Sequence, residues 1–278
     1  MQALFTGAGL RLSYDQRVVC DHLDVSIPHG AITTIIGPNG CGKSTLLRAL
    51  CRLIEPSAGS VSLEGRALTG FGRRELARRL GFLPQISVVP PGISVRELVS
   101  RGRFPYQRFL RQWSHEDEAA VGRALAETGL SGSADRLVDQ LSGGQRQRVW
   151  IALVLAQDTD VLILDEPTTY LDIAHQLEVL DLCKRLNSEL GKSLVMVLHD
   201  LNLAARYSHH LIAMKDGRIA ATGAPAELLT PQRIEDVFGI QARVMSDPVT
   251  GSPLVVPVTS LYTPSVAAEA VALQGETA

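Results

Sequence analysis

The sequence predicts an α/β fold in which helices flank a parallel sheet. One observation is the apolar, β-branched run at 31–36, followed at 43–53 by apolar residues at helical spacing. The other is that this order returns later, where the strand-like runs 161–166 and 193–200 enclose a helical segment at 174–191. Strand, helix and strand in this order are typical of parallel βαβ units.

Two further regions belong to the same predicted domain, which covers residues 1–258. Residues 1–34 alternate apolar and polar positions between turn residues, which predicts short strands and an antiparallel β subdomain. Residues 86–140 begin with a Pro/Gly-rich loop and continue with helical patterns, which predicts an inserted α-helical subdomain. The catalytic core would then comprise 1–85 and 141–258, and residues 259–278 are expected to form a weakly ordered tail.

Composition excludes several classes of protein. The 278 residues are 45% hydrophobic, and 27 basic against 29 acidic residues give a net charge of -2, so no nucleic-acid partner is expected. Apolar runs stay shorter than the ~20 residues of a membrane span, and we expect no signal peptide. The four cysteines form no CxxC pair, which argues against a zinc site or a disulfide framework and favours a cytoplasmic setting.

A glycine-rich loop follows the first buried strand and matches the pattern GxxxxGK[ST]. Glycines let backbone N–H groups surround a polyphosphate, and the following helix directs its N-terminal dipole at the charge. We expect Lys43 to contact the β- and γ-phosphates of ATP, and Ser44 to bind Mg²⁺. The alternative is a plain strand-to-helix turn. The predicted nucleotide contacts here are Gly37, Pro38, Asn39, Gly40, Cys41, Gly42, Lys43, Ser44 and Thr45.

Two carboxylates end the strand-like run at 161–164. Asp165 at the edge of a sheet can bind Mg²⁺ through water. Glu166, the next residue, can accept a proton from an attacking water and is the expected catalytic base. Without the phosphate loop, a strand that ends in solvated acids would explain the pattern equally well.

The segment Leu141–Gln145 reads LSGGQ and resembles the signature of ABC ATPases. A serine-capped helix start with free glycine N–H groups is a second anion-binding element. In that family, ATP is held between the phosphate loop of one subunit and the signature of another, so the resemblance implies a second copy as partner. It also implies a P-loop NTPase (RecA-like) ABC cassette, with signature contacts to nucleotide from Ser142, Gly143, Gly144 and Gln145.

Four other positions match family positions in order along the chain. By this resemblance, Tyr14 stacks on adenine, and Gln85 contacts Mg²⁺ and the attacking water. Asp172 belongs to the loop that contacts the second subunit, and His199 contacts the γ-phosphate. The expected catalytic set is therefore Glu166, His199, Gln85 and Lys43, and the expected metal set is Ser44, Gln85 and Asp165. Three of the four also have an ordinary structural explanation: Tyr14 as a core aromatic, Gln85 as a surface loop residue and His199 as a hydrogen-bonded histidine at a strand end.

Five stretches are similar to ATPases of iron–siderophore, haem and cobalamin importers, with the ferric enterobactin type nearest: 102–109, 111–121, 168–182, 199–219 and 237–257. The resemblance covers residues 1–258. It implies an ATP-hydrolysing importer subunit at the cytoplasmic face of the bacterial inner membrane. Its partners would be integral-membrane permeases and, indirectly, a substrate-binding protein. A soluble ABC ATPase, a regulatory nucleotide-binding module and a small-molecule kinase are the alternatives.

Two features allow more specific predictions. The stretch at 101–111 is basic and aromatic, and its arginines are Arg101, Arg103, Arg108 and Arg111. The family resemblance implies that it forms a groove for a cytoplasmic helix of the permease. A solvated helix end is one alternative, and nucleic-acid binding, which the net charge disfavours, is another. Charge reversal at Arg101 and Arg103 should then uncouple ATP hydrolysis from transport. Cys41 lies at a helix start, which should favour its thiolate and make the site sensitive to alkylation.

Overall fold

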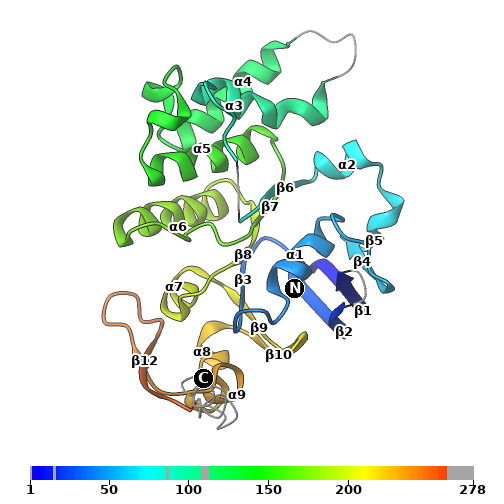
Figure 1. Ribbon diagram of the computed structural model, residues 1–278, viewed down its shortest axis with the longest axis vertical. Coiled ribbons are helices and arrows are strands. Elements are labelled where there is room, and N and C mark those ends of the chain that lie inside the picture. Colours follow the sequence, from blue (N-terminus) through cyan, green and yellow to red (C-terminus); the bar gives the residue numbers. More distant parts are fainter. Residues whose placement is uncertain (1, 15–16, 86–87, 108–112, 262–278) are drawn as a thin grey trace, which may run out of the picture.

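A computed structural model gives the structure, and it describes residues 2–14, 17–85, 88–107 and 113–261. At its centre is a six-stranded sheet of order β10-β9-β3-β8-β7-β6 (Figure 1). Neighbours pair in parallel except β9 and β10, which form an antiparallel edge. The strands are β3 (Ile32–Ile36), β6 (Leu80–Leu83), β7 (Val161–Leu164), β8 (Ser193–Val197), β9 (His210–Lys215) and β10 (Arg218–Gly223).

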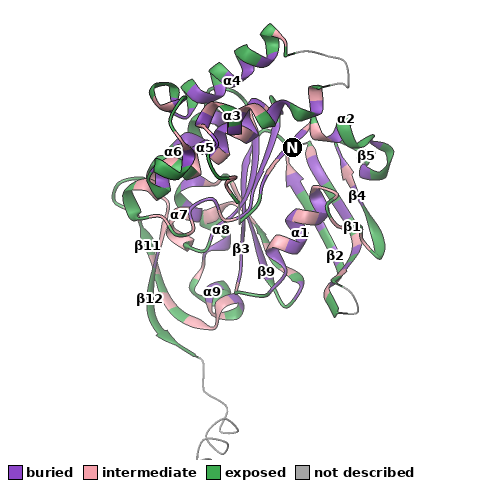
Figure 2. Ribbon diagram, turned by 45° about the horizontal axis from the view of Figure 1, so that its top comes forward, coloured by how far each residue is buried: buried purple, intermediate pink, exposed green. Residues whose placement is uncertain are grey.

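This sheet divides the interior into two apolar clusters, because side chains alternate across a strand. On β7, Leu162 and Leu164 face the cluster that packs under the helices that follow, whereas Val161 and Ile163 face the other cluster. Both faces are covered, which explains why β3, β7 and β8 are buried throughout and read as continuous apolar runs (Figure 2). The first cluster includes residues of α5 (Gly143–Ala156), α6 (Ile173–Ser188) and α7 (Leu201–Tyr207).

The second cluster lies under an antiparallel sheet of order β2-β1-β4-β5 and under α1. The strands predicted as short at the start of the chain are instead two twelve-residue strands, whose pairing is interrupted by register shifts. One shift lies at Gly9, which has φ 57° and donates its N–H to Asp24 Oδ1 at 2.7 Å. The elements here are β1 (Ala3–Tyr14), β2 (Arg17–Pro28), α1 (Lys43–Leu50), β4 (Ala58–Leu63), β5 (Arg66–Ala67), η1 (Leu68–Gly70) and α2 (Arg73–Ala77).

Between β6 and α5 the described residues form helices and no named strand. Ser94 and Ser114 each begin a helix with a reciprocal capping pair, the carboxylates being those of Glu97 and Asp117. These helices pack on α5 (Figure 1). They are α3 (Val95–Ser100), η2 (Arg101–Tyr106), α4 (His115–Glu127), η3 (Ser131–Ser133) and η4 (Val138–Gln140).

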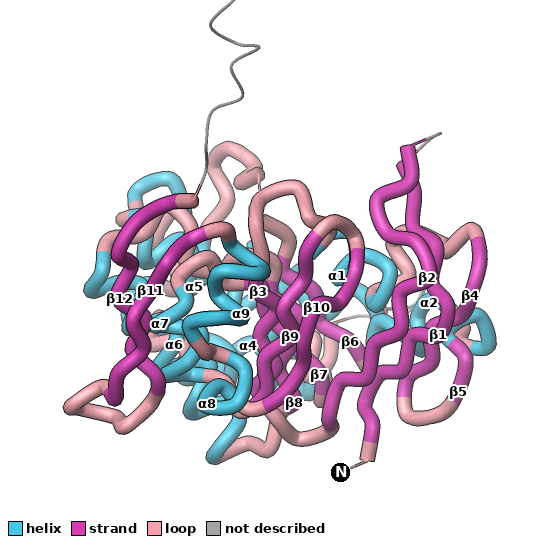
Figure 3. Tube along the Cα trace, turned by 90° about the horizontal axis from the view of Figure 1, so that it is seen from below, coloured by secondary structure: helices cyan, strands magenta, loops and turns pink. Residues whose placement is uncertain are grey.

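The last described elements are two helices and a hairpin: α8 (Pro225–Leu228), α9 (Pro231–Phe238), β11 (Ile240–Ser246) and β12 (Pro253–Ser260). Figure 3 shows this hairpin and the β1–β2–β4 sheet on opposite sides of the central sheet. Thr259 and Ser260, assigned above to a tail, end β12, and 262–278 lie outside the described residues. Across the described ranges, no helix is long and apolar enough to cross a membrane.

Candidate active site

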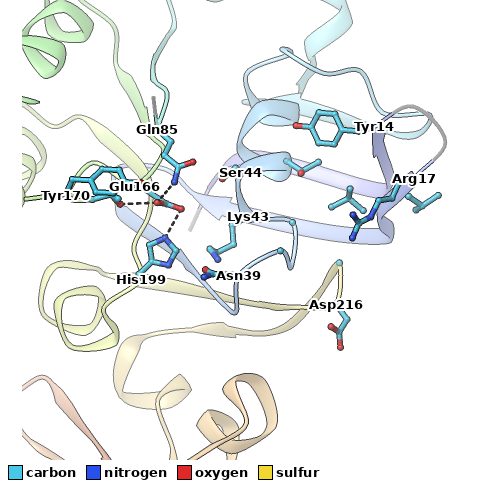
Figure 4. Close-up of a pocket in the computed structure, with 17 residues that line it drawn as sticks. Tyr14, Arg17, Asn39, Lys43, Ser44, Gln85, Glu166, Tyr170, His199 and Asp216 are labelled. Atoms are coloured by element: carbon cyan, nitrogen blue, oxygen red, sulfur yellow. Dashed lines mark hydrogen bonds and ion pairs between the residues drawn. The ribbon is translucent and has the colours of Figure 1, made fainter. Parts of the chain in front are cut away.

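Four parallel strands deliver polar residues to one edge of the central sheet. The phosphate loop follows β3, Gln85 follows β6, Asp165 and Glu166 follow β7, and His199 follows β8. Because the strands are parallel, their carboxyl ends meet at the same edge, where open α/β sheets bind ligands. A pocket at this edge is lined by loop residues 39, 40 and 42–45 and by Gln85, Glu166 and His199 (Figure 4). The separate motifs of the sequence are thereby brought to one place.

The phosphate loop depends on glycine at two points. Gly37 has φ 153°, and a Cβ there would lie 2.2 Å from the Met214 carbonyl oxygen. Gly42 caps α1 with φ 103°, a conformation that L side chains rarely adopt. Lys43 is buried and its Nζ donates to the carbonyl oxygens of Gly37 and Pro38, at 2.9 Å and 3.0 Å. The loop therefore holds the ammonium group of Lys43 beside the start of α1, where anionic oxygens bind.

Beside the loop, Ser44 Oγ donates to Asp165 Oδ1 at 2.9 Å. The other oxygen, Asp165 Oδ2, is buried and has no hydrogen-bond partner among the described residues. Burial raises the pKa of Asp165, although the hydrogen bond from Ser44 opposes this. A hydroxyl and a carboxylate oxygen without a partner are the hard ligands that Mg²⁺ prefers, and a bound cation would compensate the buried charge. The residues present therefore fit a divalent cation.

Glu166 lies at the centre of a hydrogen-bond network. Its side chain is only 8% exposed, and its backbone has φ 55°, a left-handed conformation that is unusual for a non-glycine residue. Gln85 Nε2 and Thr169 Oγ1 donate to Oε2 at 2.6 Å and 3.0 Å, and His199 Nε2 lies 2.7 Å from Oε1. Burial would raise the pKa of Glu166, but the hydrogen bonds from His199, Thr169 and Gln85 together outweigh it and hold the pKa below its usual range. Glu166 is thus an oriented, ionised acceptor.

Tyr14 lies at the other end of the pocket, half-exposed, and its hydroxyl accepts a hydrogen bond from Arg48 Nη1 at 2.9 Å. Arg17 and Asp216 lie near this end too (Figure 4). No motif in the sequence pointed to these two, nor to Thr169 and Tyr170, which also line the pocket. The one local signal was that Thr169 stands three residues after Glu166, within reach in a tight turn.

The signature forms the start of α5 but does not line this pocket of the described chain. Ser142 is the N-cap: its Oγ accepts from the Gln145 N–H at 3.3 Å, and its own N–H donates to Gln145 Oε1 at 3.1 Å. Asp172 is likewise the N-cap of α6, not a lining residue. The structure therefore brings together the residues predicted around the phosphate loop and leaves those of the signature and of Asp172 apart.

Known proteins are similar to this chain in sequence and in fold. A family model described as ABC transporter matches residues 20–169. This chain belongs to that family. The ferric enterobactin transport ATP-binding protein FepC of Escherichia coli is 52% identical over 92% of this chain and 94% of its own. The achromobactin transport ATP-binding protein CbrD of Dickeya dadantii is 50% identical, over 91% and 94%.

A solved structure of another ABC cassette is also similar. It is the ATP-binding cassette MJ0796, in a dimeric post-hydrolysis state bound to ADP and Pi. It matches with a TM-score of 0.69 and 28% identity, over 79% of this chain and 98% of its own. The fold and the α/β architecture of an ABC cassette are therefore established for this chain.

Two predictions for this ABC cassette are wrong in detail. Arg103 does not face a groove: it is 4% exposed, and its Nε donates to Asp117 Oδ1 at 2.8 Å, because η2 packs that side inward against α5. Arg101 is exposed as expected. Cys41 is buried, and this burial raises the pKa of its thiol, although nearby Lys43 opposes the effect. Of the remaining predicted arginines, Arg108 and Arg111 lie outside the described residues.

Proposed function

We propose that this chain is the ATP-hydrolysing subunit of an importer of iron–siderophore complexes. The observation that carries the catalytic part is the Glu166 carboxylate, held by Gln85, Thr169 and His199 beside the phosphate loop. The cargo is inferred from the two relatives named above, which are a ferric enterobactin and an achromobactin transport ATP-binding protein. Haem and cobalamin are the competing cargoes.

The residues divide the work of hydrolysis. Lys43 and the N–H groups of the phosphate loop bind the phosphates of ATP. Ser44 and Asp165, together with Gln85, would hold Mg²⁺, which neutralises charge on the phosphate oxygens when bound. Glu166 orients the attacking water and accepts its proton, and His199 holds the γ-phosphate. Catalysis of this kind depends on positioning and charge stabilisation more than on covalent chemistry.

The site is completed by a second copy. The phosphate loop and the signature of one chain lie apart, and an anion bound in the pocket would be out of reach of its own Ser142. The start of α5 offers a serine cap and glycine N–H groups to an anion from another molecule. The dimeric relative bound to ADP and Pi supports the same assembly. Signature residues 142–145 and Asp172 of one copy then serve ATP held by the other copy.

The helical subdomain, residues 86–140, couples ATP hydrolysis to the membrane permease. A groove there is lined by Glu97, Ser100, Arg101, Phe104 and Trp113, and Phe104 is 69% exposed. We assign it to a cytoplasmic helix of a permease in the bacterial inner membrane, with a substrate-binding protein acting on the far side. Arg101→Glu should uncouple hydrolysis from transport in reconstituted vesicles. Arg218→Glu, an exposed arginine on β10, should leave coupling intact.

Glu166→Gln tests the catalytic assignment. The amide keeps an acceptor oxygen for its neighbours but cannot take a proton, so hydrolysis should fall by about 100-fold or more. ATP binding should persist, and the variant should accumulate as a dimer in ATP. Near-normal phosphate release would remove Glu166 from this role. Uptake of labelled ferric enterobactin, haem and cobalamin by a deletion strain, with and without this gene, identifies the cargo.

A further inference from the structure

The first turn of α6 contains a histidine, His175, that contacts both the signature helix α5 and the loop of residues 166–172, which is called the loop below. We propose that His175 is a positioning residue, which couples Asp172 to Gly144 so that the loop and the signature move together. The inference rests on the proposed function, since it concerns how one subunit serves two ATP sites.

The first contact orders the loop. Asp172 Oδ1 accepts from the backbone N–H of His175 at 2.9 Å and lies 2.7 Å from His175 Nδ1. The backbone N–H and the ring of His175 thus both contact the same carboxylate oxygen of Asp172. This fixes the rotamers of both side chains. The next residue, Gln176, donates to the Leu171 carbonyl oxygen at 3.0 Å. Through Thr169, which donates to Glu166, the same short loop reaches the catalytic carboxylate.

The second contact reaches α5. A Cβ placed on Gly144 would lie 2.0 Å from Cδ2 and 2.5 Å from Cγ of His175, so the imidazole ring occupies the space that a side chain there would need. Gly144 has no positive φ, and so its backbone alone would accept alanine. The second glycine of the signature is therefore required by the ring packed against it, in addition to leaving its N–H open.

These contacts link the two parts of one chain that act on different ATP molecules. The loop begins at Glu166, which acts on the ATP of its own subunit, whereas the signature acts on the ATP of the other copy. A shift of the loop during hydrolysis must displace the ring, and the ring lies directly on the signature helix. An ion pair also joins α5 and α6 in the described chain: Arg148 Nη2 lies 3.7 Å from Glu178 Oε2, and the Glu178 side chain is half-exposed. It supplies a matched control on the same two helices.

The contact itself is tested by melting curves of the full chain, which need no activity. Alanine is favoured over glycine in a helix, so Gly144→Ala should raise Tm wherever space is available. With His175 present, it should lower Tm instead, because the new methyl group overlaps the ring. Without the ring, Gly144→Ala should raise Tm: the Gly144→Ala/His175→Ala double variant should melt at a higher temperature than His175→Ala alone. A Gly144→Ala effect of the same sign in both backgrounds would overturn the contact.

The coupling is tested in the Glu166→Gln background, by the ATP concentration that gives half-maximal dimer. His175→Ala should raise it about tenfold, within the usual range of coupling between sites. His175→Phe keeps a ring without the Nδ1 donor, and His175→Asn keeps a donor without the ring, so each should raise it less. Glu178→Gln should stay within about twofold of the background, well below the range of such coupling.

Binding of a fluorescent ATP analogue by the monomer distinguishes positioning from general damage. It should be unchanged in His175→Ala, because His175 is not among the residues that line the pocket. Equal loss of monomer binding and dimerisation, or wild-type dimerisation in His175→Ala, would overturn the proposal. Failure of the Glu166→Gln reference itself to dimerise would refute the composite site of the proposed function, while the melting curves would still decide the contact.

Discussion

Replacing Arg103 by alanine should destabilise the whole domain. The guanidinium is buried: Nε donates to Asp117 Oδ1 at 2.8 Å, Nη1 donates to the Ala156 carbonyl oxygen at 2.9 Å, and the group stacks 3.8 Å from the centre of the Tyr106 ring. The Asp117 carboxylate is equally buried and, among the described residues, would keep only its hydrogen bonds from Ser114. Removing one partner of a buried ion pair costs about 3–5 kcal/mol, since the other charge is left without its counterion.

For a chain of this size that loss corresponds to a fall in Tm of roughly 6–20 °C. Calorimetry or melting followed by circular dichroism measures it, with Arg101→Ala as the matched control, because Arg101 is the neighbouring exposed arginine. The control should change Tm by less than about 2 °C, as surface substitutions do. Equal Tm values for the two variants at neutral pH would refute the reasoning and would support the original prediction that Arg103 faces the groove.

The same variant has a pH signature. Burial opposes ionisation of Asp117, but the hydrogen bonds from Arg103 and Ser114 outweigh it and hold the pKa of Asp117 below its usual range. A depressed pKa contributes stability above the unfolded pKa, and that stability is lost as the pH falls through the folded pKa. The difference in Tm between wild type and Arg103→Ala should therefore be full at neutral pH and shrink below about pH 4.

Three further outcomes are expected. Iodoacetamide at neutral pH should label Cys41 far more slowly in the native protein than in denaturant, because burial raises the pKa of its thiol; rapid native labelling in a peptide map would contradict this. Glu166→Gln should lower Tm most at neutral pH and progressively less below about pH 4.5, because the pKa of Glu166 is depressed in the fold; a difference independent of pH would argue against the network. Asn202→Leu should cost about 1–3 kcal/mol, since the Asn202 amide both donates to and accepts from the Val255 backbone. Hydrogen exchange should then speed up in β12 and not in β3, and equal exchange in both strands would count against a local effect.

Some features of the site were recognisable from short stretches of chain. The glycines before Lys43, the serine before Gly143 and the acids after a buried apolar run each act through backbone groups a few residues away. Such local interactions can be predicted without knowledge of the fold. The same holds for the parallel sheet, because a strand buried on both faces must be apolar throughout.

Other features depended on packing between distant parts of the chain. Arg103 and Arg101 are two residues apart and look alike in sequence, yet one is buried on Asp117 and the other is exposed. Cys41 has the helix start that lowers a thiol pKa, but its burial in the fold decides the direction. No pattern linked His175 to Gly144, 31 positions earlier, because the contact exists only where two helices cross.

By itself the sequence determined the motifs of the family and, from them, the predicted roles toward phosphate, metal and water, since those roles follow from residue types and the backbone beside them. Only the tertiary structure decided which charges are buried, which pKa values rise or fall, and which motifs of one chain share a pocket. The physical reason is range: caps and loops act within one turn of chain, whereas burial and ion pairing depend on segments that meet only after folding.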